Sequence, residues 1–495
     1  MRGSWGMSRR AASVLAPSDP GSTLIAATRI DGLGGRLLAM VNAKALADTF
    51  GHRFGFTWSR KAPAEKVFHS VEAADRIFSP GFIERYWLGE KIKTSSFGIL
   101  DEAALAGRSL GEVARERKLR GWICDDLRIL RHYRGEPAQL VGQPATLRSF
   151  DYSTAVKEAI DTANESRFPR PMAALHLRSG DIVHGRYRTS LVYARKVIPA
   201  TLARAIVSEL SRLGMATLLV GQHRATLDYL KAETGAMLTS DFGADAFADE
   251  TLKAFFEMAL MARCRQIHAG LSIYAEIASL MGEVPLMPAT SLYDARRAAG
   301  IILDELKDHE ADYDPREAAF GYQSAFLAME QTASPGQARG VLEKARALDR
   351  DNDAYALKMA STYFRERDYT SGEAVLKSVV TRQFQARPKI PVTIMRLLGE
   401  MASDRYPFAT DFEFFHAAGE AGYPYAAACS AWILQQTTAD RGRALAMAHR
   451  AVRAAPADPI VRKVRRRILQ GKRPRSGLIA KARWRIAWLR GLGAG

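Results

Sequence analysis

The stretch PMAALHLRSGDIVH, from Pro171 to His184, decides the fold, because its apolar run stops abruptly at a polar loop. The run predicts a buried strand, and polar residues such as His176, Arg178 and Asp181 gather at its carboxyl end. Open α/β sheets bind ligands at the carboxyl ends of their strands. A guanidinium there suits a phosphate, because its rigid fork of donors can hold two oxygens at once. The stretch therefore predicts either an anion-binding crevice at Arg178 or a surface Arg–Asp pair that closes a turn.

Strands and helices alternate regularly after this stretch, and an amphipathic helix from Tyr152 to about Glu165 precedes it. Strands that alternate with helices of ten or more residues predict a parallel sheet with right-handed crossovers. The predicted helices are Ile198–Leu213, Ala225–Thr234, Glu250–Ala262 and Tyr274–Met281, and the predicted strands are Ala216–Val220, Met237–Thr239, Gln266–Ala269 and Pro285–Met287.

A second α/β unit is predicted upstream, and it contains a glycine-rich loop. Its elements are a strand at Thr23–Ile30, the loop DGLGGR at Asp31–Arg36, a helix at Leu37–Phe50 and a further strand at Arg53–Trp58. Gly51 is placed to cap the helix. Gly32, Gly34 and Gly35 permit a tight turn whose backbone N–H groups form an anion-binding nest, or they make a plain strand-to-helix turn. The loop lacks both the Gly-Lys-Ser/Thr ending of a Walker loop and the third glycine of a dinucleotide fingerprint. Between residues 60 and 150 only a strand at Gly121–Cys124 is expected.

A third candidate site is the turn AGLSIYAEIA, from Ala269 to Ala278, which places Ser272 at a helix N-terminus. A serine there can cap the helix or donate its hydroxyl to a phosphate held by the same N–H groups.

Length and composition predict a folded cytoplasmic protein. The chain has 495 residues, 47% of them hydrophobic, which allows three domains of ordinary size. No apolar run reaches the roughly 18 to 20 residues of a membrane span, and the first 22 residues lack a signal-peptide core. The three cysteines lie far apart without metal-type spacing, so we expect neither a zinc site nor a disulfide framework.

Positive charge is concentrated at the C-terminal end. Of the net charge of +18, twelve basic residues lie from Arg462 onward with no acidic residue among them, which leaves +6 for the rest. Because this charge sits in a tail and not on a recognition motif, we expect no nucleic acid as partner. Within the tail, Leu478 to Leu492 mixes apolar residues, two tryptophans and cations, which predicts an interfacial helix at an anionic membrane or a solvated basic tail.

The strands stop after Pro315, and the remaining chain is predicted to be helical. Small and apolar residues recur there with a period of 34 residues, as Ala338, Leu342 and Ala345, then Gly372, Leu376 and Val379, with a degenerate unit at Ala444, Ala448 and Ala451. This is the tetratricopeptide period, although alanine-rich helices can also produce it by chance. Such helices offer a concave binding surface.

Three motifs in this order resemble those of GDP-fucose-dependent fucosyltransferases, the superfamily of α1,2-, α1,6-, nodulation and protein O-fucosyltransferases. They are GLGGR at Gly32–Arg36, HLRSGD at His176–Asp181, and the set Glu257, Cys264, Ser272, Tyr274, Glu276 and Ala278. The resemblance covers about residues 23 to 300. It implies a GT-B fold, in which two Rossmann-like halves hold the donor GDP-fucose in their cleft and no metal is required.

The resemblance also implies roles for individual residues. Arg178 would hold the diphosphate, His176 would lie against the nucleotide, and Ser272 would add a hydrogen bond to a phosphate. The remaining residues of the donor-binding set are Gly32, Gly34, Gly35, Arg36, Tyr274 and Glu257. Two positions depart from the family, since Gly35 replaces the asparagine of GxGN and Ser179 replaces the second arginine of HxRR. These departures weaken the case for fucose more than that for a nucleoside diphosphate sugar.

The chemistry is consistent with these residues. Breaking a glycosyl–phosphate bond leaves negative charge on the diphosphate, which fixed cations and helix N-termini can stabilise without a metal. Inversion at the sugar needs a general base for the acceptor hydroxyl. His184 is the first candidate and Asp181 the second, although Asp181 can instead orient Arg178 or cap the turn.

The sequence thus predicts a cytoplasmic glycosyltransferase, peripheral to the inner face of the membrane if the tail binds there, with a glycan, lipid-linked glycan or protein as acceptor. The alternative is a tetratricopeptide scaffold with a non-catalytic sugar-nucleotide-binding domain. If the helical part binds the acceptor or a partner, deletion of Gly336–Gly495 should spare donor hydrolysis and impair transfer to the acceptor. The predicted parts are a leader (residues 1–22), an acceptor-side half (23–160), a donor-binding half (161–315), helical repeats that offer a surface to a protein partner (316–460) and a basic tail (461–495).

Overall fold

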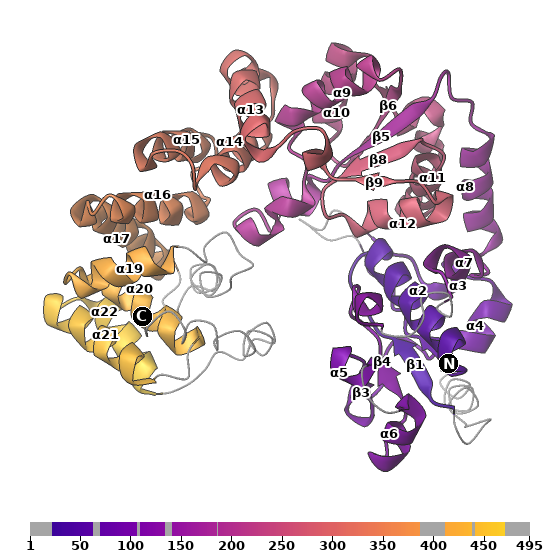
Figure 1. Cartoon of the computed structure of the whole chain (residues 1–495), viewed down its shortest axis with the longest axis horizontal. Helices are drawn as coiled ribbons and strands as arrows, with labels where there is room; N and C mark the ends of the chain where they lie inside the picture. The colour runs from indigo at the N-terminus through magenta and orange to yellow at the C-terminus, as the bar shows by residue number, and fades with distance from the viewer. Residues whose placement is uncertain are drawn as a thin grey trace, which may run out of the picture. The chain divides into compact units, whose positions relative to one another are not determined.

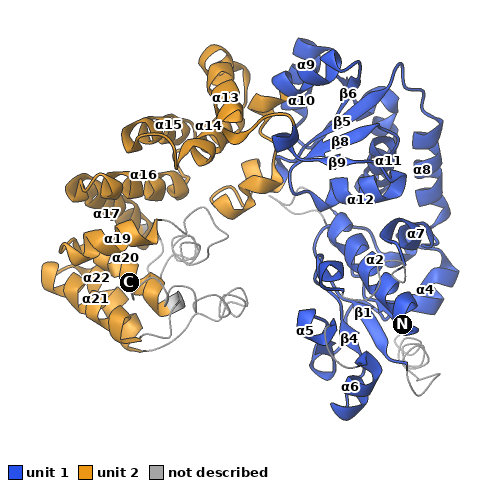
Figure 2. Ribbon diagram, in the orientation of Figure 1, with its two compact units in different colours: residues 1–180, 204–291 blue, residues 181–203, 292–495 orange. Residues whose placement is uncertain are grey.

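The computed structural model describes residues 22–62, 70–105, 109–133, 141–185, 187–386, 411–437 and 441–470. The chain divides into two compact units, residues 1–180 with 204–291 and residues 181–203 with 292–495 (Figure 2). Both parallel sheets belong to the first unit. The predicted leader up to residue 21 and the tail from residue 471 lie outside the described residues.

The first sheet lies in the N-terminal half of the first unit, and its strand order is β2-β1-β4-β3, with every pairing parallel. Its strands are β1 (Leu24–Ala27), β2 (Arg53–Phe56), β3 (Gly98–Ile99) and β4 (Trp122–Ile123). All four residues of β1 are buried, as expected of a central strand covered on both faces. The predicted strand at Thr23–Ile30 is longer than β1, which ends at Ala27. Beyond it, the Thr28 hydroxyl donates to the Asp125 carboxylate, and the Arg29 guanidinium donates to the Asp31 carboxylate.

The second sheet has the order β7-β6-β5-β8-β9, again with every pairing parallel (Figure 1). Its strands are β5 (Met172–Leu177), β6 (Ala216–Gly221), β7 (Met237–Leu238), β8 (Gln266–Ala269) and β9 (Leu286–Met287). Helices α9 (Ala203–Arg212) and α10 (Arg224–Thr234) cover one face, and α8 (Thr154–Glu165), α11 (Glu250–Ala262) and α12 (Ile273–Gly282) cover the other (Figure 1). The predicted fold class of two Rossmann-like parallel-sheet halves is confirmed.

Helix α2 (Leu33–Phe50) begins earlier than the sequence suggests. We expected a loop up to Arg36, but Gly34 and Gly35 lie in the first helical turn, with Gly32 as the N-cap. The helix ends at Gly51, whose left-handed backbone (φ 66°) makes the predicted C-cap. The glycine motif is therefore a helix N-terminus and not a separate loop.

Short helices that the sequence did not reveal complete the N-terminal half. They are α3 (Ala74–Ile77), α4 (Pro80–Tyr86), α5 (Glu102–Leu105), α6 (Leu110–Glu116) and α7 (Gln143–Arg148). One hydrophobic core runs through both halves, from Leu37 of α2 and Phe56 of β2 to Phe255 of α11 and Ile277 of α12. The halves therefore form one packed body.

In the second unit the described part after residue 292 is all helical. Its α-helices are α13 (Ala295–His309), α14 (Pro315–Met329), α15 (Pro335–Leu348), α16 (Asp353–Arg365), α17 (Tyr369–Ala386), α19 (Phe412–Glu420), α20 (Pro424–Thr437), α21 (Arg441–Ala454) and α22 (Pro459–Leu469). The residues of the 34-residue period, among them Ala338, Leu342, Leu376 and Ala444, are buried between these helices. None of the helices in the described ranges combines the length and apolar character that crossing a bilayer requires.

Candidate functional site

Strand order identifies a candidate site in the second sheet. The chain proceeds outward from β5 to β6 and β7, and then returns to the other side of β5 as β8. In open α/β sheets, ligands bind outside the carboxyl ends of the strands at such a switch point. His176 pairs with Ala269 across β5 and β8, so Arg178 and Ser272 follow neighbouring strand ends. The structure thus brings two of the predicted motifs to one edge of the sheet.

His176 is the buried polar residue of this site. Its Nδ1 has no hydrogen-bond partner among the described residues, and its ring centroid lies 5.5 Å from that of Tyr274. Burial, together with the nearby charge of Arg178, lowers the pKa of His176 to about 3. The imidazole is therefore neutral near pH 7 and can accept or donate a hydrogen bond.

Tyr274 is held by a buried network behind it. Its hydroxyl donates to the backbone oxygen of Ala254 at 2.9 Å and to Oε2 of Glu257 at 3.2 Å. The other carboxylate oxygen, Oε1, accepts from the Thr239 hydroxyl at 2.9 Å. Burial raises the pKa of both Glu257 and Tyr274. Glu257, which we predicted to bind the donor, contacts Tyr274, which in turn packs on His176.

Two helix N-termini, one from each half, meet at the switch point. A Cβ added at Gly34 of α2 would lie only 3.1 Å from the backbone nitrogen of Tyr274 on α12. Only glycine allows this approach without displacing backbone. Ser272 is buried and caps α12 by accepting from the Ala275 N–H at 3.5 Å. The positive ends of two helix dipoles therefore lie side by side, an arrangement that favours an anion.

Arg36 has a structural environment. Its guanidinium is buried and donates to the backbone oxygens of Asp31, Ser59 and Ile30 at 2.8, 2.6 and 3.1 Å. It also lies over the Trp58 ring, 5.0 Å from the centroid. Arg36 therefore ties the end of β1 to the end of β2, a role that its place in the glycine motif did not reveal.

A second switch point, in the first sheet, was missed by sequence reasoning. Chain order reverses there between β1 and β4, and the Asp125 carboxylate accepts from the backbone N–H of Thr28 at 2.7 Å. Arg128, just beyond, forms an ion pair with Glu276 of α12 and so links the halves. The sequence signal for this switch point was the acidic pair Asp125 and Asp126, which directly follows the predicted strand at Gly121–Cys124.

Arg178 lies at the carboxyl end of β5 and is half-buried, whereas the two candidate bases that follow it belong to the second unit. Asp181 and His184 lie in a π-helical turn, Gly180–His184. Within that unit, Nε2 of His184 lies 3.1 Å from Oε1 of Glu317, which is buried, and the His184 side chain is 9% exposed. The imidazole is thus oriented by a carboxylate, as general bases often are.

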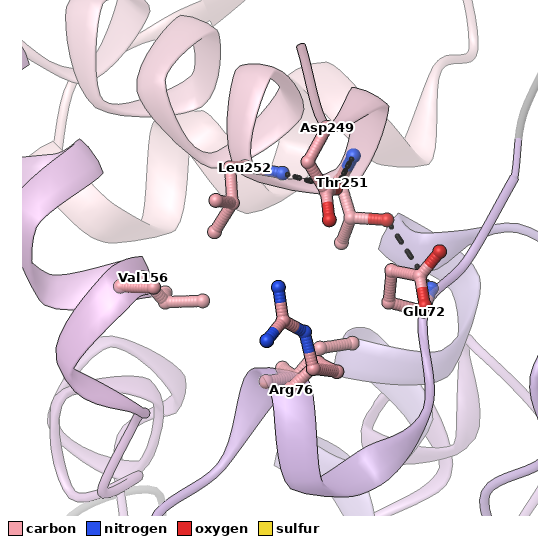
Figure 3. Close-up of a pocket in the computed structure, with 8 residues that line it drawn as sticks. Glu72, Arg76, Val156, Asp249, Thr251 and Leu252 are labelled. Carbon is pink, nitrogen blue, oxygen red and sulfur yellow. Dashed lines mark hydrogen bonds between the residues drawn. The ribbon is translucent and has the colours of Figure 1, made fainter. Parts of the chain in front are cut away.

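A separate small pocket, open to solvent, lies between α3, α8 and the start of α11 (Figure 3). The side chain of Arg76 points into it toward Asp249 and Leu252 (Figure 3). Nearby, the Thr251 hydroxyl accepts from the Glu72 N–H at 3.2 Å. The lining contains none of the residues predicted from the motifs, and the pocket marks a junction between the halves.

No family model matches the chain, and no curated protein matches it. Among solved structures, the chain is similar to the fucosyltransferase NodZ from Bradyrhizobium, with 15% identity and a TM-score of 0.34 over 55% of this chain and 96% of that one. It is also similar to POFUT1 in complex with GDP, with 10% identity and a TM-score of 0.32 over 55% of this chain and 99% of that one. At these identities the likeness concerns the fold alone.

Proposed function

We propose that this protein is a glycosyltransferase that takes its sugar from a nucleoside diphosphate sugar. The observation that carries the proposal is the switch point of the second sheet, where the neutral, buried His176 packs on Tyr274 of α12 and Arg178 follows at the carboxyl end of β5. A cation and a helix N-terminus suit a diphosphate, and an uncharged ring with a free nitrogen suits the nucleotide. GDP-fucose is the donor that the motif order favours.

In the proposed reaction the bond between the sugar carbon and the diphosphate oxygen breaks, while the acceptor oxygen bonds to that carbon from the opposite face. Arg178 and the N–H groups of α12 stabilise the charge on the leaving diphosphate. His184, oriented by Glu317, takes the proton of the acceptor hydroxyl, with Asp181 as the second candidate. The proposal requires no metal. The acceptor is a glycan, a lipid-linked glycan or a protein.

Two further parts of the proposal concern partners. The helices of the second unit are proposed to bind the acceptor or a protein partner. The basic tail is proposed to hold the protein at the cytoplasmic face of an anionic membrane, with charge as the attractive force.

The test is a thermal-shift panel of sugar nucleotides on the full chain, followed by donor hydrolysis in the presence of EDTA. A ligand that binds only the folded state raises the melting temperature, so GDP and GDP-fucose should stabilise the protein and other nucleotides less. Hydrolysis should continue in EDTA. Binding without hydrolysis would favour the non-catalytic scaffold, and absence of any shift would reject the donor site.

A further inference from the structure

The segment that follows the phosphate-binding loop is built into the helical unit. Residues 181–203 leave the first unit directly after Gly180 and belong to the second (Figure 2). Ile182, Val183 and Val197 are buried and form a hydrophobic cluster with Phe320 of α14. Leu191 is 1% exposed and is part of the core cluster that contains α16. The segment is therefore part of the helical core and not a surface connection.

Polar contacts fix the start of this segment. Nε2 of His184 lies 3.1 Å from Oε1 of Glu317, and Nδ1 lies 3.8 Å from Oδ1 of Asp314. The guanidinium of Arg316 donates to the backbone oxygen of His184 at 3.3 Å. The first turn of α14 thus holds both the side chain and the backbone of one residue, six positions after Arg178.

A second attachment lies four residues further along. Arg188 forms an ion pair with buried Asp349, at the end of α15. The Asn352 side chain donates to the backbone oxygen of Arg188 and to the Asp349 carboxylate, each at 3.2 Å. Breaking a buried pair of this kind leaves an uncompensated charge, so the segment is held strongly.

We propose that the helical unit keeps the phosphate-binding loop in place, with Glu317 and Asp349 as positioning residues that act through residues 181–188. A cation binds a diphosphate well only when its loop is already ordered, since ordering on binding costs affinity. Arg178 is separated from the first attachment by a few residues of buried chain. The inference rests on the proposed function in one respect, namely that Arg178 holds the diphosphate.

The experiment compares Glu317→Leu, Asp349→Ala and the conservative Glu317→Gln in the full chain. Asp411→Asn is the matched control, because Asp411 is a buried acid of the same unit whose carboxylate binds Lys358 at 2.7 Å. Two quantities are measured: GDP affinity by calorimetry, and amide hydrogen exchange of residues 178–203. We expect Glu317→Leu and Asp349→Ala to weaken GDP binding at least tenfold and to speed exchange in the segment. In Asp349→Ala, which leaves the contact between His184 and Glu317 in place, the KM for the donor should rise more than kcat falls.

Glu317→Gln, which can still accept a hydrogen bond from the imidazole, should recover most of the affinity, and the control should stay within twofold of wild type. Wild-type affinity and exchange in Glu317→Leu and Asp349→Ala would overturn the inference, as would an equal effect in the control. If the wild-type chain does not bind GDP, the proposed function fails. Hydrogen exchange then still tests the inference: faster exchange at residues 178–188 in Glu317→Leu and Asp349→Ala supports it, and unchanged exchange overturns it.

Discussion

His176 and Arg178 flank Leu177 at the carboxyl end of β5, and their surroundings differ. His176 is buried within the sheet and kept neutral, while Arg178 emerges half-buried at the carboxyl end. Desolvation strengthens the interaction of a fixed cation with a developing negative charge. Such a pair can recognise a nucleotide with one member and stabilise a leaving diphosphate with the other.

Arg178→Ala should abolish GDP binding and donor hydrolysis while the protein stays folded. Loss of a charge-assisted phosphate contact typically costs about 2 to 4 kcal/mol, or roughly 30- to 1000-fold in affinity. Arg178→Lys should recover only part of this, because a point charge cannot reproduce the fork of the guanidinium. Calorimetry with GDP and thermal unfolding of both variants provide the check, and an alanine variant with wild-type affinity would refute the donor site.

His176 should make the protein sensitive to acid. The pKa of an unfolded histidine is about 6.5, whereas that of folded His176 is about 3, so between these values only the unfolded chain takes up the proton. Stability from this residue is present above pH 6.5 and is lost as the pH falls toward 3. His176→Asn should therefore reduce the slope of unfolding free energy against pH by up to about 1.4 kcal/mol per pH unit in that window. Urea titrations at several pH values measure the slope, and identical slopes for both proteins would contradict the assignment.

At the scale of elements, the approach of α2 to α12 depends on one missing side chain. Gly34→Ala should separate the helices, because the new Cβ would meet the Tyr274 backbone at 3.1 and 3.2 Å. Gly81→Ala is the matched control, since Gly81 is also the second residue of a helix and its Cβ would meet nothing within 4 Å. In an open helix this exchange typically stabilises by up to about 1 kcal/mol.

We therefore expect the two substitutions to differ in sign. Gly81→Ala should raise the free energy of unfolding or leave it unchanged, with GDP affinity as in wild type. Gly34→Ala should lower both stability and GDP affinity. Equal effects in chemical unfolding and calorimetry would show that the helix contact is not needed.

Local pattern predicted the second sheet well, because the central strands β5 and β6 are mostly apolar and fully or almost fully buried, and helices of ten or more residues separate the strands. The bounds of α11 and β8 match the prediction at both ends. Between residues 60 and 150 the elements are short, and tertiary contacts determine them. The ion pair of Arg128 with Glu276 joins residues 148 positions apart, and no local signal indicates such a partner.

Candidate residues were easier to identify than their contacts. The motif order pointed to His176, Tyr274 and Glu257, and the structure joins them in one chain of contacts. That Arg36 binds three backbone oxygens could not be read from its neighbours, since those oxygens come from loops folded against it. The role of a side chain depends on which groups surround it in the folded protein, and these contacts are determined by the tertiary structure and not by the local sequence.

At the scale of the whole molecule, the attachment of residues 181–203 to the helices changes an expectation. The sequence suggested that Gly336–Gly495 could be deleted without loss of donor hydrolysis. That deletion removes Asp349 and Asn352, which hold Arg188, and the α16 residues that bury Leu191. We now expect a chain ending at residue 335 to lose donor hydrolysis and GDP binding, whereas a chain ending at Gln470 should keep both. Normal hydrolysis by the shorter chain would show that the helices serve the acceptor alone.

The last prediction concerns the C-terminal end of the chain. In α22 the apolar residues Val461, Val464 and Ile468 are buried against the helical unit, and Arg462, Arg466 and Arg467 are exposed. This helix can attract an anionic surface by charge, but of its large apolar side chains only Leu469, at its C-terminal end, is exposed. The segment after it, outside the described residues, adds seven more basic residues together with Trp484 and Trp488.

Each basic residue near an anionic leaflet contributes about 1 kcal/mol at most, and tryptophans add affinity for the interface. The full chain should therefore sediment with anionic vesicles at low salt and be released at high salt, because salt screens the attraction. A chain ending at Gln470 should remain in the supernatant, and neutral vesicles should bind neither protein. Equal sedimentation of both chains would assign the binding to α22 or another folded surface, and absence of binding at low salt would exclude a membrane role for the tail.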